Sequence, residues 1–244
     1  DKGYEIKKFV ETFTVGNDYE LDLNLVKYDC EVSITHTKKL SKMGLIKENE
    51  KNKLIKALNK IKLLAKEKKF LIKPEDEDCH TAIEKYLVNH LGNVGKKIHL
   101  AKSRNDQILT SMKLFEIHEL KELNNLQKIL GDKLKEKCDE IGSIKIPGYT
   151  HMQKAMPTDI KTWLESFSES LNDNIDLIKY TIKHINQSPL GSAAGFGVPV
   201  FNIDKKFTAK DLGFKRVQKN PIYCQLSRGK FEGIICSSIN AIMF

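Results

Sequence analysis

Cysteine, proline and arginine are scarce in this 244-residue sequence, and long apolar runs are missing. The five cysteines are an odd number and form no CxxC pair, which favours a reduced, intracellular protein over a disulfide-stapled secreted one. No segment approaches the roughly 18–20 apolar residues of a membrane-spanning helix, and no signal peptide is recognisable. No Cys/His cluster has zinc-site spacing. We therefore expect a cytoplasmic protein with no membrane partner and no metal site.

Only three of the 41 basic residues are arginines: Arg104, Arg216 and Arg228. The formal net charge is +9, but acidic residues are interspersed among the lysines along the same segments. Proteins that bind nucleic acids favour arginine for its bidentate fork. We interpret the charge as a lysine bias and expect no nucleic-acid partner.

Helical periodicity dominates the sequence. Apolar residues at Leu54, Leu58, Ile61 and Ala65 are spaced by three or four, which predicts an amphipathic helix within 47–69. Thr81 to Glu84 has the pattern of a capping box, which predicts a second helix that places His80 at its start and ends at Gly92.

Two longer periodic runs follow, from Asn105 for about thirty-five residues and from Leu164 to Ile185, and a third begins at Phe231. Helices this long need partners to cover their apolar stripes. Strand patterns are weak and occur only around 144–149 and 198–203. The sequence predicts a mainly α protein with a small helical N-terminal domain (1–103) and an elongated, incomplete long-helix bundle (104–244).

Both ends of the sequence suggest a fragment. It opens at Asp1 without an initiator methionine, and it stops at Phe244 inside an apolar periodic segment that has no capping signal. We expect the parent protein to be longer.

Three polar loops separate the helical runs: Ser103 to Gln107, Pro147 to Gln153, and the Gly-rich Ser188 to Gly197. The first is typical either of a helix cap with a solvated arginine or of an anion site at a helix N-terminus. The second offers Thr150, His151 and Gln153, although a lone loop histidine is more often structural than catalytic. The third does not match GxGxxG, and we interpret it as a tight turn.

Together these loops resemble the argininosuccinate lyases of the fumarase/aspartase superfamily. The resemblance rests on Gly95 to His99 followed by Ser103 to Gln107, on Pro147 to Gln153, on Ser188 to Gly197, and on Val15 to Asp18 with Tyr28 to Ser33. It implies the reversible elimination of argininosuccinate to arginine and fumarate without metal or cofactor. It also implies a homotetramer with a central bundle of long helices and active sites shared between subunits.

The resemblance implies roles for eight residues. Thr150 and His151 would be the catalytic pair, with His151 as the acid/base. Ser103, Arg104 and Asn105 would hold carboxylate or amino groups of the substrate. His80, Gln153 and Asp18 would also contact the substrate, Asp18 standing where many members have a serine.

The sequence departs from the family pattern at two places. Ala101 and Lys102 stand where the family usually has Gly and Arg. The family's mobile loop, which supplies a catalytic serine, lies beyond Phe244, so we expect this chain alone to be inactive. Two alternatives stay open: a non-catalytic helical scaffold of the same fold, and a sister lyase acting on another substrate.

Overall fold

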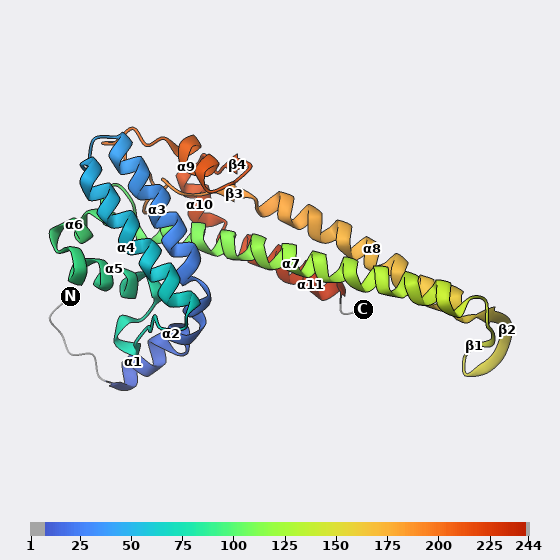
Figure 1. Cartoon of the computed structure of the whole chain (residues 1–244). Helices are drawn as coiled ribbons and strands as arrows, with labels where there is room; N and C mark the ends of the chain where they lie inside the picture. Colours follow the sequence, from blue (N-terminus) through green and yellow to red (C-terminus); the bar gives the residue numbers. More distant parts are fainter. Residues whose placement is uncertain (1–7, 243–244) are drawn as a thin grey trace. The chain divides into compact units, whose positions relative to one another are not determined.

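The computed structural model describes residues 8–242, and most of them lie in helices (Figure 1). The chain forms two compact units. Unit 1 comprises the chain up to Glu116 together with Asn186–Arg228, and unit 2 comprises Ile117–Ile185 together with the chain from Gly229. The single domain boundary at Ser103 stays a prediction. In the described part of the chain, no helix has the length and apolar character needed to cross a membrane.

Unit 1 contains most of the short helices. Its elements are α1 (Lys8–Val15), α2 (Asp18–Leu21), η1 (Asp22–Asn24), α3 (Val26–Lys42), α4 (Glu48–Lys66), η2 (Pro74–Asp76), α5 (Cys79–Leu91), α6 (Asn93–Lys96), η3 (Lys97–His99), the first part of α7 (Arg104–Ile141), β3 (Gln187–Ser188), α9 (Lys205–Asp211), β4 (Arg216–Val217) and α10 (Pro221–Leu226). Strands β3 and β4 form one short parallel pair.

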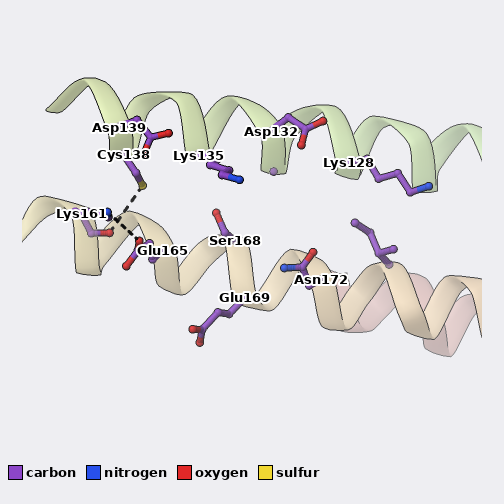
Figure 2. A pocket seen from close by; sticks show the side chains of 12 residues that line it. Lys128, Asp132, Lys135, Cys138, Asp139, Lys161, Glu165, Ser168, Glu169 and Asn172 are labelled. Carbon is purple, nitrogen blue, oxygen red and sulfur yellow. Dashed lines mark hydrogen bonds and ion pairs between the residues drawn. The ribbon is translucent and has the colours of Figure 1, made fainter. Parts of the chain in front are cut away.

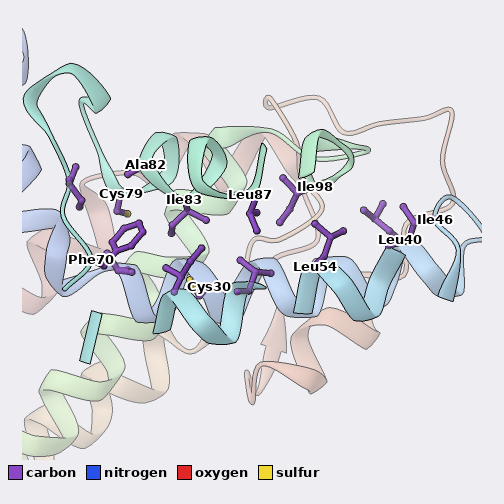
Figure 3. Packing of buried hydrophobic residues seen from close by; sticks show 14 residues of the cluster. Cys30, Leu40, Ile46, Leu54, Phe70, Cys79, Ala82, Ile83, Leu87 and Ile98 are labelled. Carbon is purple, nitrogen blue, oxygen red and sulfur yellow. The ribbon is translucent and has the colours of Figure 1, made fainter. Parts of the chain in front are cut away.

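The apolar core of unit 1 lies among α3, α4 and α5 (Figure 3). The stripe predicted on the helix within 47–69 is confirmed, since Leu54, Leu58 and Ile61 are fully buried in this core and Ala65 packs against it. Burying each of these leucine or isoleucine side chains stabilises the fold by about 1.5–3 kcal/mol.

The start of α5 differs from the predicted capping box. The helix begins at Cys79, and its N-cap is Asp78, whose side chain accepts a hydrogen bond of 2.8 Å from the backbone N–H of Thr81. The predicted N-cap, Thr81, therefore lies three residues after the observed one, because aspartate is itself a strong N-cap residue. His80 lies in the first turn and Gly92 ends the helix with φ of +58°, both as predicted.

Unit 2 consists of the remainder of α7, the helices α8 (Ile160–Ile185) and α11 (Lys230–Ile242), and a hairpin of β1 (Lys145–Thr150) and β2 (Gln153–Asp159). The three long periodic runs are confirmed as α7, α8 and α11. Helix α8 packs on α11 through a buried hydrogen bond of 2.6 Å between the hydroxyls of Thr181 and Ser238.

The two strand predictions had different outcomes. The candidate around 144–149 is confirmed as β1, but the candidate at 198–203 is wrong, because that segment is an irregular turn region. Gly197 enters it with φ of +83°, and Pro199 lacks the N–H that a strand ladder needs. Strand β2 was not predicted, since Pro157 interrupts its pattern.

Two glycines in helices should respond to alanine with opposite signs. At Gly95 an added Cβ would meet the backbone oxygen of Leu87 at 2.5 Å, so Gly95→Ala should lower the free energy of unfolding by about 1–3 kcal/mol. At Gly131 in α7 an added Cβ would meet no atom within 4 Å apart from the backbone of its own helix, so Gly131→Ala should raise the free energy of unfolding by about 0.5–1 kcal/mol. Urea denaturation of both variants measures these effects, and a stabilising Gly95→Ala would contradict the packing of α5 on α6.

Candidate functional site

The motif beginning at Ser103 forms the N-terminus of α7. The side-chain hydroxyl of Ser103 accepts a hydrogen bond from the backbone N–H of Asn105 at 3.2 Å. The backbone N–H of Ser103 in turn donates to the Asp106 carboxylate at 2.9 Å. This reciprocal pattern is a helix cap, and it leaves the hydroxyl proton of Ser103 available as a donor.

The last two residues of the motif are buried and hold neighbouring segments. Asp106 accepts hydrogen bonds from the backbone N–H groups of Gly191 and Ala193 at 2.8 and 3.0 Å. Its carboxylate therefore joins the Gly-rich loop to the start of α7. Sequence reasoning assigned it no role, although a carboxylate three residues after a serine cap is a recognisable signal.

Gln107 connects α7 to α3. Its side-chain amide donates to the backbone carbonyl of Asp29 and to the hydroxyl of Ser33, both at 3.0 Å. The side-chain oxygen of Gln107 accepts from Lys102 at 3.1 Å. Gln107 therefore fixes the position of Asp29 relative to the motif, a role that the sequence pattern did not indicate.

Arg104 forms an ion pair with Asp78, the residue that caps α5. This contact joins the starts of α5 and α7. A pocket of about 240 Å³ opens beside the pair, and Asp18 lies in its wall. Its lining comprises Thr14, Val15, Asp18, Glu77, Asp78 and Arg104. Two of the predicted substrate-binding residues, Asp18 and Arg104, thus share one cavity.

His80 is buried on α5 and contacts a buried carboxylate. Its Nδ1 lies 3.3 Å from Oδ2 of Asp29, and the ring of His99 stands edge-on at a centroid distance of 5.5 Å. Burial would raise the pKa of Asp29, but the hydrogen bond and charge of His80, with the charge of Lys102, hold that pKa below its usual value. The pair fixes the orientation of the imidazole.

Replacement of Asp29 should change how stability depends on pH. Because the pKa of Asp29 is depressed in the folded chain, its contribution is complete above the unfolded value of about 3.9 and is lost as the pH falls through the folded value. Asp29→Asn should therefore lower stability at pH 7 and weaken the loss of stability at acidic pH. Urea midpoints between pH 7 and pH 3 test this, with Asp173→Asn on the exposed surface of α8 as control. Parallel pH curves for Asp29→Asn and the parent would contradict it.

The two departures from the family pattern are accommodated locally. Ala101 has φ of +55°, a left-handed conformation that glycine adopts without strain, which fits the glycine that the resemblance implies at this position. Lys102 turns inward to Gln107, and burial lowers its pKa while Asp29 and Asp106 oppose that shift. The turn into Ser103 is therefore formed despite both substitutions.

Thr150, His151 and Gln153 lie in the β1–β2 hairpin of unit 2, where the sequence suggested a simple loop. Thr150 pairs with Gln153, and His151 and Met152 form the two-residue turn. Both turn residues are exposed and have positive φ, +50° and +61°. Two-residue hairpin turns favour this conformation, but it usually requires asparagine or glycine. The imidazole of His151 is thus presented on a strained turn.

The eight predicted residues form two sets. Unit 1 carries Asp18, His80, Ser103, Arg104 and Asn105, and unit 2 carries Thr150, His151 and Gln153. Within unit 1, Asp18 and Arg104 line one pocket, and Ser103 and Asn105 share the cap of α7. His80 contacts Asp29 instead. Among residues 8–242, no group of three or more His, Cys, Asp or Glu side chains has an arrangement suited to a metal ion.

A larger cavity of about 720 Å³ lies in unit 2, between α7 and α8 (Figure 2). Its walls carry lysines and carboxylates of both helices, including Lys135 and Glu165, and the thiol of Cys138 contacts the carbonyl of Lys161 at 3.9 Å. None of the eight predicted residues lines it. The mixed charge and the absence of the motif residues favour a space between helices over a substrate site.

The helical fold and the motifs define a member of a lyase family. The chain belongs to the family described as Lyase, whose model matches residues 5–230. It is 49% identical over 244 residues to an argininosuccinate lyase of Thermotoga neapolitana, covering 100% of this chain and 61% of the relative. It is 38% identical over 242 residues to an argininosuccinate lyase of Parabacteroides distasonis, covering 99% and 54%. The chain thus spans little more than half the length of these relatives.

Solved structures support the same fold. An EDDS lyase variant with bound fumarate matches with a TM-score of 0.74 at 20% identity, covering 99% of this chain and 47% of that one. A fumarate lyase:delta crystallin from Brucella melitensis bound to cobalt matches with a TM-score of 0.75 at 17% identity, covering 95% and 56%. The predicted fumarase/aspartase-like fold is confirmed.

Proposed function

We propose that this chain is part of an argininosuccinate lyase, which cleaves argininosuccinate reversibly to arginine and fumarate. The observation that carries the proposal is the similarity to relatives of that name along the whole chain, at 49% identity to one of them. The geometry at the start of α7 adds to it, because Ser103 and Asn105 present polar groups there on a turn held by the buried Asp106.

The residue types suit this elimination. Removal of a proton next to a carboxylate builds up negative charge, which needs hydrogen-bond donors already in place. The hydroxyl of Ser103 and the side-chain amide of Asn105 are such donors, and the helix dipole favours an anion at the start of α7. A histidine is suited to protonating the leaving guanidino nitrogen near neutral pH, which is the role we assign to His151.

The two sets of residues would act together in an assembled protein. We assign the hairpin and the α7 start to active sites shared between subunits of a homotetramer. Exposed apolar side chains on the helices of unit 2 support assembly, because a monomer gains nothing by exposing them. They are Leu126, Ile129 and Leu130 on α7, and Trp163, Phe167 and Tyr180 on α8.

A chimera tests the proposed activity. Residues 1–244 would be joined to the remaining C-terminal part of the Thermotoga neapolitana relative, and fumarate release from argininosuccinate would be followed by absorbance. We expect turnover by the chimera and none by the 244-residue chain alone. A folded, assembled chimera that releases no fumarate would refute the proposed function, and rapid turnover by the chain alone would refute the requirement for further sequence.

A further inference from the structure

Arg228, one of the three arginines, contacts the predicted binding motif. It follows α10 and donates from Nη1 to the side-chain oxygen of Asn105 at 3.3 Å, although 123 positions separate the two residues. The side chain of Arg228 is exposed. Among residues 8–242 no carboxylate lies within ion-pairing distance of it. Its positive charge is therefore available to a ligand.

Arg104 is in the opposite situation. Its guanidinium is ion-paired with Asp78, and that carboxylate also caps α5. A substrate carboxylate would have to compete with Asp78 for the positive charge of Arg104. The contact therefore suits Arg104 to joining α5 and α7 better than to binding an anion.

The contact with Arg228 also fixes the side-chain amide of Asn105. Because the amide oxygen accepts from Arg228, the NH₂ group of Asn105 is the half that is free to donate. A guanidinium has five N–H donors, and this hydrogen bond uses one of them. The Ser103 hydroxyl lies on the same turn, since it accepts from the Asn105 backbone. Hydroxyl, amide and guanidinium thus offer donors around one helix N-terminus.

We propose that Arg228 is the carboxylate-binding arginine of this site, that it takes a carboxylate of the dicarboxylate product or of the matching part of the substrate, and that it orients Asn105. Arg104 is then a positioning residue. The inference rests on the proposed lyase function and deepens it by reassigning the role that the family resemblance gives to Arg104. A planar bidentate partner is what a guanidinium provides and a lysine does not.

The small number of arginines makes a direct test practical. In the 244-residue chain labelled with ¹⁵N-arginine, three Nε–H signals are expected, and Arg228→Lys and Arg216→Lys assign them. During titration with fumarate, the Arg228 signal should shift with saturation while those of Arg104 and Arg216 stay in place. Acetate at equal ionic strength is the control for a general anion effect. A shift of Arg104 with Arg228 unchanged, or no shift of any signal, would overturn the inference.

The chimera gives a second measurement. Arg228→Lys should raise KM about 10–100-fold, the range expected for losing hydrogen bonds to a charged group, with a smaller effect on kcat. Arg216→Lys, on the exposed surface of β4, is the matched control and should leave both constants unchanged. An unchanged KM in Arg228→Lys would overturn the inference while the parent chimera still confirmed lyase activity. A chimera without activity would count against the function alone, because the fumarate titration tests Arg228 independently.

Discussion

Asp106→Ala should lower the free energy of unfolding of the chain by about 3–5 kcal/mol, the range for breaking a buried polar network. The Asp106 side chain is fully buried and accepts hydrogen bonds from three backbone N–H groups, those of Ser103, Gly191 and Ala193. Truncation leaves all three donors without this acceptor, and those of Gly191 and Ala193 are buried. The loss of stability would affect both the start of α7 and the Gly-rich loop, which the carboxylate joins.

Urea denaturation followed by circular dichroism measures this effect. Asp106→Asn should lie between the parent and Asp106→Ala, because an amide keeps one acceptor oxygen but adds two donors that have no partner there. Hydrogen exchange at Gly191 and Ala193 should accelerate in both variants. Asp173→Asn, an exposed aspartate on α8, is the matched control and should change stability by less than about 0.5 kcal/mol. An Asp106→Ala variant within 1 kcal/mol of the parent would show that the network is not needed for folding.

The same network explains the Gly-rich loop, which the sequence indicated only as a tight turn. Gly191 has φ of +100°, and an added Cβ would lie 2.9 Å from a side-chain carbon of Ile203. Glycine is therefore required both by the backbone conformation and by the available space. The turn prediction was correct in kind, but the partner of the turn, a carboxylate 85 positions away, could not be inferred from local pattern.

The helices could be predicted from the sequence, since apolar residues spaced by three and four indicate which face of a helix is buried. The stripe through Leu54, Leu58 and Ile61 carried this information directly. The strand prediction at 198–203 was wrong because a short apolar run has no comparable spacing. Whether such a run forms a strand depends on a partner strand elsewhere in the chain.

The motifs of the candidate site could be recognised in the sequence, but the contacts of their residues could not. Ser103 and Asn105 were identified from a motif, whereas the Arg104–Asp78 ion pair and the Arg228–Asn105 hydrogen bond join positions far apart in sequence. Such contacts depend on tertiary packing, which a local pattern does not contain. The small number of arginines was the one useful clue in the sequence. Where nearly all basic residues are lysines, an arginine indicates a position at which a planar, bidentate cation is needed.

His151→Asn should lower kcat of the chimera about 10²–10⁴-fold, the usual contribution of general acid–base catalysis by one side chain. The substitution isolates chemistry from structure because His151 has φ of +50° at the tip of the hairpin. Asparagine adopts this conformation more readily than most residues and is favoured in two-residue turns. The hairpin should therefore be kept, and only the titratable imidazole is lost.

Met152→Gly tests the alternative explanation, in which the strained backbone of the turn, and not the imidazole of His151, supports activity. Met152 has φ of +61° and its side chain is almost fully exposed, so glycine should relieve strain and leave His151 in place. We expect kcat of Met152→Gly to stay within about threefold of the parent, a barrier change of under 1 kcal/mol, with thermal stability equal or higher. If His151→Asn kept the parental rate, His151 would not be the acid/base. Met152→Gly keeps the imidazole, whereas His151→Asn removes it. If both variants lost the same activity, the geometry or the apolar contact of the turn would account for the loss.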